Sequence, residues 1–441
     1  MKNVFLFLLL ALSVLTCKKE AKKPAPPTPD PEKEEVVIPE APKFRNIQND
    51  KVDTSSLTLI PNDIQLQNGK SFTLNLPEGY AITPAAEGLK RVRFFAKAPD
   101  NRLFVTGMHN LTDNKKGKIF ILDSFNLETK QFDKISEWKT ALRNPNSVQF
   151  YQDTTGQDWI YYAVTDGVIR HKYEAGELMP TGVGEEITTF PGQGLSYKYG
   201  GWHLTRTLAF FEDKLYISVG SSCNLCEEVE SERATILQMN PDGTDKKVYA
   251  NGIRNAVDLS WVEGQLYATN MASDHLGNDM PNDYFYQVNE GQDYGWPYCY
   301  EHNGQLYDED PKDQSDNRVA GKIVKDTFAN KTINCQTIPK AYALFEAHAA
   351  PLGFEYFDHE TKSNATRNYF LVAHHGSTLA KVGTGHRIIR MKSTAQQSTL
   401  IDGFLKGKTR VGRPCDIIQN DDKSFFFTDD YAGVVYYVEE E

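Results

Sequence analysis

A short strand with a polar turn before it and an apolar, aromatic core recurs along the chain. Its six copies are Leu103–Thr106, Ile160–Tyr162, Leu215–Ser218, Leu266–Thr269, Tyr369–Val372 and Phe425–Thr428. Successive copies begin 57, 55, 51, 103 and 56 residues apart, so four intervals are nearly equal and one is about twice as long. Units of this length with several strands each are typical of β-propeller blades.

Further strand-like runs lie between the copies, separated by turns, and no amphipathic helix of convincing length interrupts them. Examples are Lys118–Leu122, Val168–Arg170 and His386–Arg390. The pattern predicts an all-β fold, a six-bladed β-propeller with four-stranded blades over residues 46–441, and an excursion outside the blades at about residues 299–345. The alternative is a pair of β-sandwiches, which gives no reason for equal intervals.

The N-terminus has the pattern of a targeting signal. A charged start and the apolar run Val4–Leu15 are followed by Cys17, and the run is short for a membrane span. Its end resembles a bacterial lipobox, which implies a signal peptide over residues 1–17 with Cys17 lipidated. An ordinary secretory signal with an incidental Cys17 is the alternative. Residues 18–45, rich in Lys, Glu and Pro, predict an unfolded tether. We expect a lipid-anchored protein of a bacterial cell envelope, periplasmic or surface-exposed, that meets the membrane only through this anchor.

Composition narrows the class of partner. The 441 residues carry 48 basic and 59 acidic side chains, a net charge of −11, and 40% are hydrophobic. The chain can therefore bury a core, and a nucleic-acid binder held by phosphate contacts is disfavoured. The 5 Trp, 22 Tyr and 24 Phe suit half-buried strands.

Cysteine spacing agrees with an oxidising compartment. Cys223 and Cys226 form a CxxC without the second CxxC of a zinc site or the His of haem attachment, which favours a local disulfide. Cys299 and Cys335 both lie in the long interval, where a bridge would stabilise the excursion. Cys415 is left as a free buried thiol.

Seven short runs of the sequence, taken together and in their order along the chain, form one pattern. They are Gly201–Arg206, Leu215–Asn224, Gly252–Val257, Tyr294–Cys299, His348–Gly353, His375–Ser377 and Gly412–Pro414. As a set they resemble the glucose/sorbosone dehydrogenases, the soluble quinoprotein sugar dehydrogenases, over roughly residues 72 to 440. The resemblance implies a six-bladed propeller that holds pyrroloquinoline quinone (PQQ) and calcium at one end of its central channel and oxidises the anomeric hydroxyl of aldoses.

The resemblance also implies roles for single residues. Hydride transfer from a hemiacetal requires a base for the hydroxyl proton and a positive field at the acceptor. His203 matches the base, and Arg254 and Asn255 match the pair that faces the cofactor. Their alternatives are a structural histidine and a surface ion-pair arginine. Arg413 matches an arginine near the PQQ carboxylates, and Lys381 is a looser candidate for a further cationic contact, with a solvated surface lysine as its alternative.

The same resemblance points to a calcium segment after the fourth repeated strand. Leu276 and Gly277 are the candidate ligands through their carbonyl oxygens, with Asp279 and Asp283 as supports, because calcium favours several oxygen ligands. An acidic solvated loop without a metal is the alternative. Cys415 stands where the resemblance expects a second arginine, so one positive contact is expected to be missing.

Two classes of function follow. The first is a PQQ- and calcium-dependent dehydrogenase of an aldose or a sorbosone-like sugar, which passes electrons to an external quinone or cytochrome because the chain has no CxxCH motif. The second is a non-catalytic propeller of the cell envelope that binds a carbohydrate or a partner protein. The combination of His203 with Arg254, Asn255 and Arg413 favours the enzyme.

Overall fold

The structure of the chain is a computed structural model. It describes residues 45–190, 203–310, 318–319, 322–323, 328, 330–358, 361, 363–378 and 382–441. The chain divides into two compact units, Met1–Lys43 and Phe44–Glu441, and the described residues belong to the second. The signal peptide and the tether up to residue 44 lie outside the described residues, so both stay predictions. Among the described residues, no helix has the length and apolar character needed to cross a membrane.

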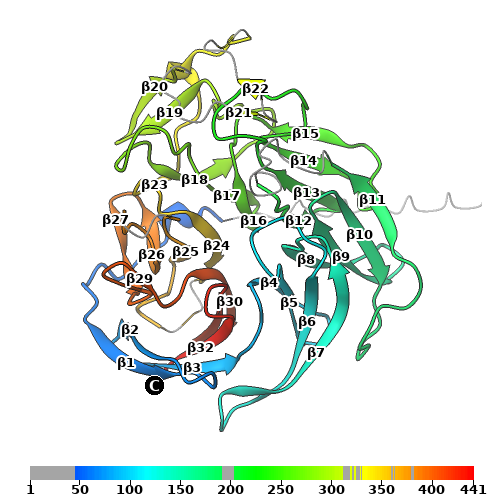
Figure 1. The fold of residues 1–441 in the computed structure, drawn as a ribbon, viewed down its shortest axis with the longest axis vertical. Coiled ribbons are helices and arrows are strands. Elements are labelled where there is room, and N and C mark those ends of the chain that lie inside the picture. The colour runs from blue at the N-terminus through cyan, green and yellow to red at the C-terminus, as the bar shows by residue number, and fades with distance from the viewer. Residues whose placement is uncertain are drawn as a thin grey trace, which may run out of the picture. The chain divides into compact units, whose positions relative to one another are not determined.

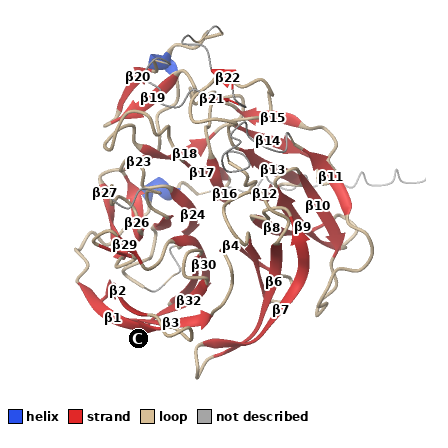
Figure 2. Cartoon of the chain, viewed as in Figure 1, coloured by secondary structure: helices blue, strands red, loops and turns tan. Residues whose placement is uncertain are grey.

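Six four-stranded antiparallel sheets form the blades (Figure 1, Figure 2). From the inner to the outer strand, the first three blades consist of β4 (Val92–Lys97), β5 (Leu103–Gly107), β6 (Gly117–Asn126) and β7 (Gln131–Leu142); β8 (Ser147–Gln152), β9 (Asp158–Val164), β10 (Gly167–Lys172) and β11 (Glu185–Thr189); and β12 (Leu208–Phe211), β13 (Lys214–Val219), β14 (Thr235–Met239) and β15 (Lys247–Ala250). The other three consist of β16 (Ala256–Val262), β17 (Gln265–Asn270), β18 (Asp283–Val288) and β23 (Ala343–Phe345); β24 (Pro351–Tyr356), β25 (Phe370–His374), β26 (Arg387–Ser393) and β27 (Gln396–Ile401); and β30 (Pro414–Asp421), β31 (Ser424–Asp429), β32 (Val434–Glu440) and β3 (Tyr80–Ala86).

The blades form a closed ring. Each inner strand contacts the inner strand of the next blade, in the order β4, β8, β12, β16, β24, β30 and back to β4. The last blade takes its outer strand, β3, from the N-terminal side of the chain, and β3 pairs with β32 with Tyr80 opposite Glu440. The predicted six-bladed β-propeller with four-stranded blades is confirmed, and the pair of β-sandwiches is excluded.

The six repeated runs are the second strands of the six blades, β5, β9, β13, β17, β25 and β31. Every residue of β5, β25 and β31 is buried. A strand that is covered on both faces has no solvent side, so its sequence is a continuous apolar run. This burial explains why the second strand of each blade carried the repeat signal.

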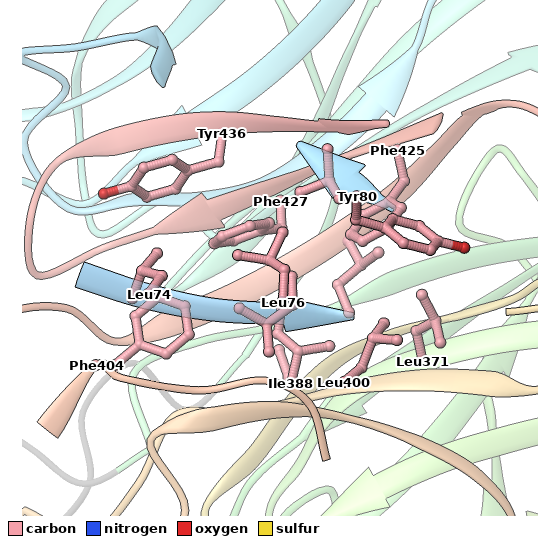
Figure 3. Close-up of a cluster of buried hydrophobic side chains, with 14 of the residues drawn as sticks. Leu74, Leu76, Tyr80, Leu371, Ile388, Leu400, Phe404, Phe425, Phe427 and Tyr436 are labelled. Carbon is pink, nitrogen blue, oxygen red and sulfur yellow. The ribbon is translucent and has the colours of Figure 1, made fainter. Parts of the chain in front are cut away.

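Large side chains fill the space between neighbouring blades. Figure 3 shows one such cluster, in which Phe427, Tyr436 and Leu371 from the last two blades meet Leu74 of the preceding segment. The rings of Phe427 and Tyr436 stack with centroids 4.9 Å apart. Leu74 belongs to β2 (Ser71–Pro77), which pairs with β1 (Leu59–Gln65), so residues before the first blade complete this part of the core.

In three of the blades, a threonine near the end of the second strand forms a hydrogen bond to the blade that follows. The Thr269 hydroxyl accepts a hydrogen bond from the Asp258 N–H at 3.2 Å and donates one to the Leu352 carbonyl of the next blade at 2.7 Å. The same pair of bonds is made by Thr106 with Phe94 and Asn146, and by Thr428 with Asp416 and Arg93. These hydroxyls satisfy buried backbone groups that no strand ladder reaches.

The excursion lies between β18 and β23. It contains the hairpin β19 (Cys299–His302) and β20 (Gln305–Asp308), the pair β21 (Arg318–Val319) and β22 (Lys322–Ile323), and the 3₁₀ turn η3 (Cys335–Thr337). A second 3₁₀ turn, η1 (Ile47–Asn49), and a small hairpin, β28 (Leu405–Lys406) with β29 (Thr409–Arg410), lie elsewhere. The predicted upper limit of about residue 345 was too late, because β23 is the fourth strand of its blade.

Both predicted disulfides are confirmed. Cys223 is bonded to Cys226, and Cys299 is bonded to Cys335 across the excursion. Cys415 is free and buried, as predicted.

We predict that Thr269→Val lowers the free energy of unfolding by about 1–3 kcal/mol, because it leaves a buried N–H and a buried carbonyl without a partner. Thr269→Ser keeps the hydroxyl and should cost less than the valine variant. Urea titrations of both variants check this, and a valine variant as stable as the wild type would contradict it.

Candidate active site

The topology gathers the predicted residues at one end of the ring. Because first and second strands are antiparallel, the beginning of each first strand lies beside the end of its second strand. Ala256 faces Asn270 and Pro414 faces Asp429 in this way. Arg254, Asn255 and Arg413 precede first strands, and His203 precedes β12. We call this end of the ring the site end.

His203 is held by the loop that follows β13. Its Nδ1 lies 2.9 Å from the Ser221 carbonyl and 3.0 Å from the Ser221 hydroxyl, and Arg206 donates to the His203 carbonyl at 2.7 Å. A carbonyl only accepts, so Nδ1 carries the proton and Nε2 carries the lone pair. Burial, and then the charge of Arg254, hold the pKa of His203 well below its ordinary value. The imidazole is therefore neutral at pH 7, as a base must be.

Gly220 makes room for His203 beside Asn255. A Cβ at Gly220 would lie 2.5 Å from Asn255 Oδ1 and 2.6 Å from His203 Cβ, so any side chain there would push the two apart. Asn255 Oδ1 is buried and has no hydrogen-bond partner among the described residues. An unsatisfied buried acceptor is costly, and a ligand that brings a donor would satisfy it.

Arg254 is fixed by the loop of the Cys223–Cys226 disulfide. Its Nε donates to the Asn224 carbonyl and its Nη2 to Asn224 Oδ1, both at 2.8 Å, and Nη1 donates to the Met271 carbonyl at 3.2 Å. Three of the five guanidinium N–H groups are used in this way. Burial lowers the pKa of Arg254, and the acidic groups around it oppose this effect. The resemblance pointed to Arg254, but no signal in the sequence pointed to Asn224 as its partner.

A second group of charges lies where the last blade meets the first. We call Arg91, Arg93, His375, Arg413 and Asp430 the seam cluster. The Asp430 carboxylate accepts from Arg91 at 3.0 Å, from Arg93 at 3.1 Å and from His375 Nε2 at 2.8 Å. The Arg413 Nε donates to the His375 carbonyl at 2.9 Å, and its Nη2 donates to the Gly376 carbonyl.

The seam cluster carries net positive charge. Burial alone would raise the pKa of Asp430, but His375 and the two arginines outweigh burial and hold it well below its ordinary value. Burial lowers the pKa of His375 to about 3 and that of Arg413 to about 10. At pH 7 three arginines thus surround one carboxylate and a neutral imidazole, which suits an anionic ligand.

The first strands carry apolar side chains next to the site residues. Phe94, Val257, Leu352 and Cys415, from four different blades, pack together with Met271 against them. We call this cluster the apolar floor. Cys415, which stands where a second arginine was expected, belongs to it. Arg93, which is paired with Asp430, lies near enough to Cys415 to interact with it electrostatically, so a positive charge remains close to this position. Arg93 lies inside β4 and was not among the residues identified from the sequence.

The candidate calcium segment follows β17. The Gly277 carbonyl accepts from His348 Nε2 at 2.6 Å, and His348 Nδ1 lies 3.1 Å from the Asp274 carboxylate. The hydrogen bond to Asp274 raises the pKa of His348 to about 9, so two oxygens of this segment already converge on a cation. Such an oxygen pair fits part of the ligand set of calcium.

The other predicted residues of this segment differ in their surroundings. Asp283 is buried and accepts from the Ala272 and Ala350 N–H groups, each at 2.8 Å, so it braces the segment. Asp279 and Gly277 are exposed, and Leu276 is half-buried. Lys381 lies outside the described residues.

The chain resembles proteins of known sequence and fold. A family model described as TrAA12-like matches residues 74–441. An uncharacterized protein of Borreliella burgdorferi is 29% identical over 237 residues, which cover 51% of this chain and 57% of that protein. The chain thus spans less than two thirds of the length of this curated relative.

Three solved structures share the fold. The calcium structure of the Trichoderma reesei carbohydrate-active enzyme of family AA12 is 17% identical, with a TM-score of 0.63 over 88% of this chain and 99% of its own. The holo form of the pyranose dehydrogenase PQQ domain from Coprinopsis cinerea is 16% identical, with a TM-score of 0.63 over 85% and 98%. The PQQ-bound aldose sugar dehydrogenase of Streptomyces coelicolor is 16% identical, with a TM-score of 0.52 over 82% and 99%.

We predict that Asp430→Asn lowers the free energy of unfolding at pH 7 by about 3–5 kcal/mol, because it leaves buried arginines without their counter-charge. The folded-state pKa of Asp430 lies below its ordinary value, so its contribution is present above about pH 4 and is lost as the pH falls through the folded-state pKa. Denaturant titrations between pH 7 and pH 3 should show the difference between wild type and variant shrinking in acid. Asp133→Asn, at an exposed position, is the control, and a constant difference would contradict the prediction.

Proposed function

Because the chain belongs to the TrAA12-like family of PQQ-dependent oxidoreductases, we propose that it oxidises an aldose or a sorbosone-like sugar with PQQ and calcium. The observation that carries this proposal is the half-buried His203, whose Nδ1 bonds Ser221, beside Asn255, whose buried Oδ1 has no partner among the described residues. His203 and Asn255 both pack against Gly220. A sugar hydroxyl requires a base such as His203, and a polar cofactor can donate a hydrogen bond to Asn255 Oδ1.

His203 acts as the general base. Its Nδ1–H is held by Ser221, so Nε2 receives the proton of the sugar hydroxyl. The low pKa favours release of that proton after each turnover, since burial disfavours the imidazolium. Arg206, through the His203 carbonyl, fixes the backbone from which the ring projects.

PQQ, when bound, supplies the electrophile that takes the hydride. Arg254 and Asn255 would hold it on the His203 side, where two Arg254 N–H groups and Asn255 Oδ1 make no hydrogen bond with the part of the chain that the structure describes. Arg413 and Arg91 hold its carboxylates at the seam cluster, and Lys381 is a further candidate. The apolar floor of Phe94, Val257 and Leu352 lies beneath these polar groups and limits access of water.

The segment after β17 would hold calcium. Gly277 and Leu276 offer carbonyl oxygens, the Asp274 carboxylate adds charge, and Asp283 and Asp279 support the loop. His348 bonds both Gly277 and Asp274, so a calcium ion held by these oxygens would compete with the His348 ring for them.

Electrons leave to an external quinone or cytochrome. The predicted signal over residues 1–17, with lipidated Cys17, carries the enzyme to the cell envelope, where residues 18–45 tether the propeller to the membrane. The two disulfides agree with this compartment.

A non-catalytic carbohydrate-binding propeller is the second candidate. An imidazole oriented by the bond from its Nδ1 to Ser221, beside the buried Arg254, favours the enzyme. Titration of the purified protein with PQQ and calcium, followed by the quinone absorbance and its bleaching by aldoses, separates the two functions. Binding without bleaching by any aldose would reject the dehydrogenase, and absence of binding would reject both the cofactor and the activity.

We predict that His203→Ala slows the reduction of bound PQQ by sugar by about two to four powers of ten, the usual contribution of a positioned base, with PQQ affinity nearly unchanged. Arg254→Ala should instead weaken PQQ binding by about 1.5–3 kcal/mol, the range for a charge-assisted hydrogen bond. Its activity should partly return at high PQQ and calcium. Equilibrium titration and single-turnover absorbance measurements separate these effects.

His302→Ala, in the excursion, is the matched histidine control and should alter neither quantity. If both site variants bind PQQ and turn over like the wild type, the assigned roles are wrong.

A further inference from the structure

The loop Ser221–Cys226 touches both halves of the catalytic apparatus. Ser221 accepts from His203 Nδ1 through its carbonyl, while its own N–H donates to the Arg254 carbonyl at 2.8 Å. Three residues later, Asn224 accepts from the Arg254 guanidinium twice. One short segment therefore sets where the base and the cofactor arginine lie relative to each other.

Asn224 is the central contact of this loop. Its Oδ1 accepts from Arg254 Nη2 at 2.8 Å and also from the Asp274 N–H at 2.9 Å. Asp274 in turn bonds His348 in the candidate calcium segment. The side chain of Asn224 thus connects the arginine on one side with the calcium segment on the other.

The loop itself is closed by a covalent bond. Cys223 and Cys226 flank Asn224 and are joined to each other. The Ser221 hydroxyl donates to the Cys223 carbonyl at 2.7 Å, and the carboxylate of Glu228 accepts from the Ser222 N–H and hydroxyl, both at 2.6 Å. The main chain is therefore fixed at both ends of the disulfide, and Asn224 has little freedom to follow a moving guanidinium.

Rigidity here has a physical consequence for the cofactor. A guanidinium that is held in place before the ligand arrives loses less entropy on binding than a free one. Three of its N–H groups point to the protein, which fixes the direction of the remaining two.

We propose that Asn224 is a positioning residue for Arg254, and that the Cys223–Cys226 disulfide locks the loop so that His203, Arg254 and the Asp274 segment keep their relative places. This inference rests on the proposed function for its effect on PQQ. The positions themselves are tested without the cofactor.

The first test compares side chains at residue 224 in the full chain. Asn224→Ala removes the shared acceptor and should weaken PQQ binding about tenfold, whereas Asn224→Asp keeps an acceptor for Arg254 and should stay within about threefold of the wild type. Urea titrations accompany the affinities, because a merely structural role would lower stability without this rescue by the aspartate.

The second test removes the lock. Cys223→Ala with Cys226→Ala should weaken PQQ binding at least as much as Asn224→Ala. The matched control is Cys299→Ala with Cys335→Ala, which removes the other disulfide and should leave PQQ affinity unchanged.

Amide hydrogen exchange of the cofactor-free proteins provides a readout that does not depend on PQQ. In Asn224→Ala the Asp274 N–H loses its acceptor, so its exchange should become faster. Exchange of the Ser221 N–H should become faster when the Cys223–Cys226 bond is absent. Neither should change in the variant without Cys299–Cys335. Unchanged exchange at both amides would overturn the proposal, as would unchanged PQQ affinity in both loop variants. If the wild type binds no PQQ, the proposed function fails, and the exchange data still decide the positioning role.

Discussion

The pairing of β3 with β32 is the constraint on which the rest of the molecule depends. It joins residue 80 to residue 440 and makes the first and last blades neighbours. Across that seam, Thr428 donates to the Arg93 carbonyl and Asp416 accepts from the Phe95 N–H. The seam cluster exists only because of this closure, since Arg91 and Arg93 come from the first blade and Asp430 from the last. A ring that opened would break up the seam cluster and leave β32 as an unpaired sheet edge.

The surroundings of the seam arginines thus differ from those of His203. At the seam, Arg91 and Arg93 share the Asp430 carboxylate and stabilise its ionised form, so charge is retained under burial. At His203, burial and Arg254 together favour the neutral ring. The two environments separate a cationic region, suited to carboxylates, from a neutral base, and both use residues that precede first strands.

The sequence predicted the fold well because of where its signal arose. Second strands such as β5 and β31 are buried on both faces, so they appear as apolar runs at regular intervals, and six runs indicated six blades. The end of the excursion was harder to predict from the sequence, since β23 has only three residues and joins its blade through pairing with β18. A strand that short carries no periodicity of its own.

The resemblance assigned His203, and Arg254 with Asn255, from short motifs, and the structure brings these residues to the same end of the ring, while their roles stay predictions. The site was not predictable where partners are distant in the chain. Arg93 and Asp430 are separated by 337 positions, and nothing in either local sequence indicates the other. Asn224 appeared in the sequence as the interior of a CxxC and the end of one motif, and neither indicated that it contacts Arg254.

Cys415 illustrates how this limits inference from a single position. At residue 415 the chain has a thiol where an arginine was expected, which by itself suggests a weakened cofactor site. The side chain at this position packs against Phe94 and Leu352, where an uncompensated charge would be costly. Arg93 reaches the same region from the next blade and is paired with Asp430. A positive charge at the seam can come from either of the two blades that meet there, so the residue at one position says less about the charge of this region than its neighbours do.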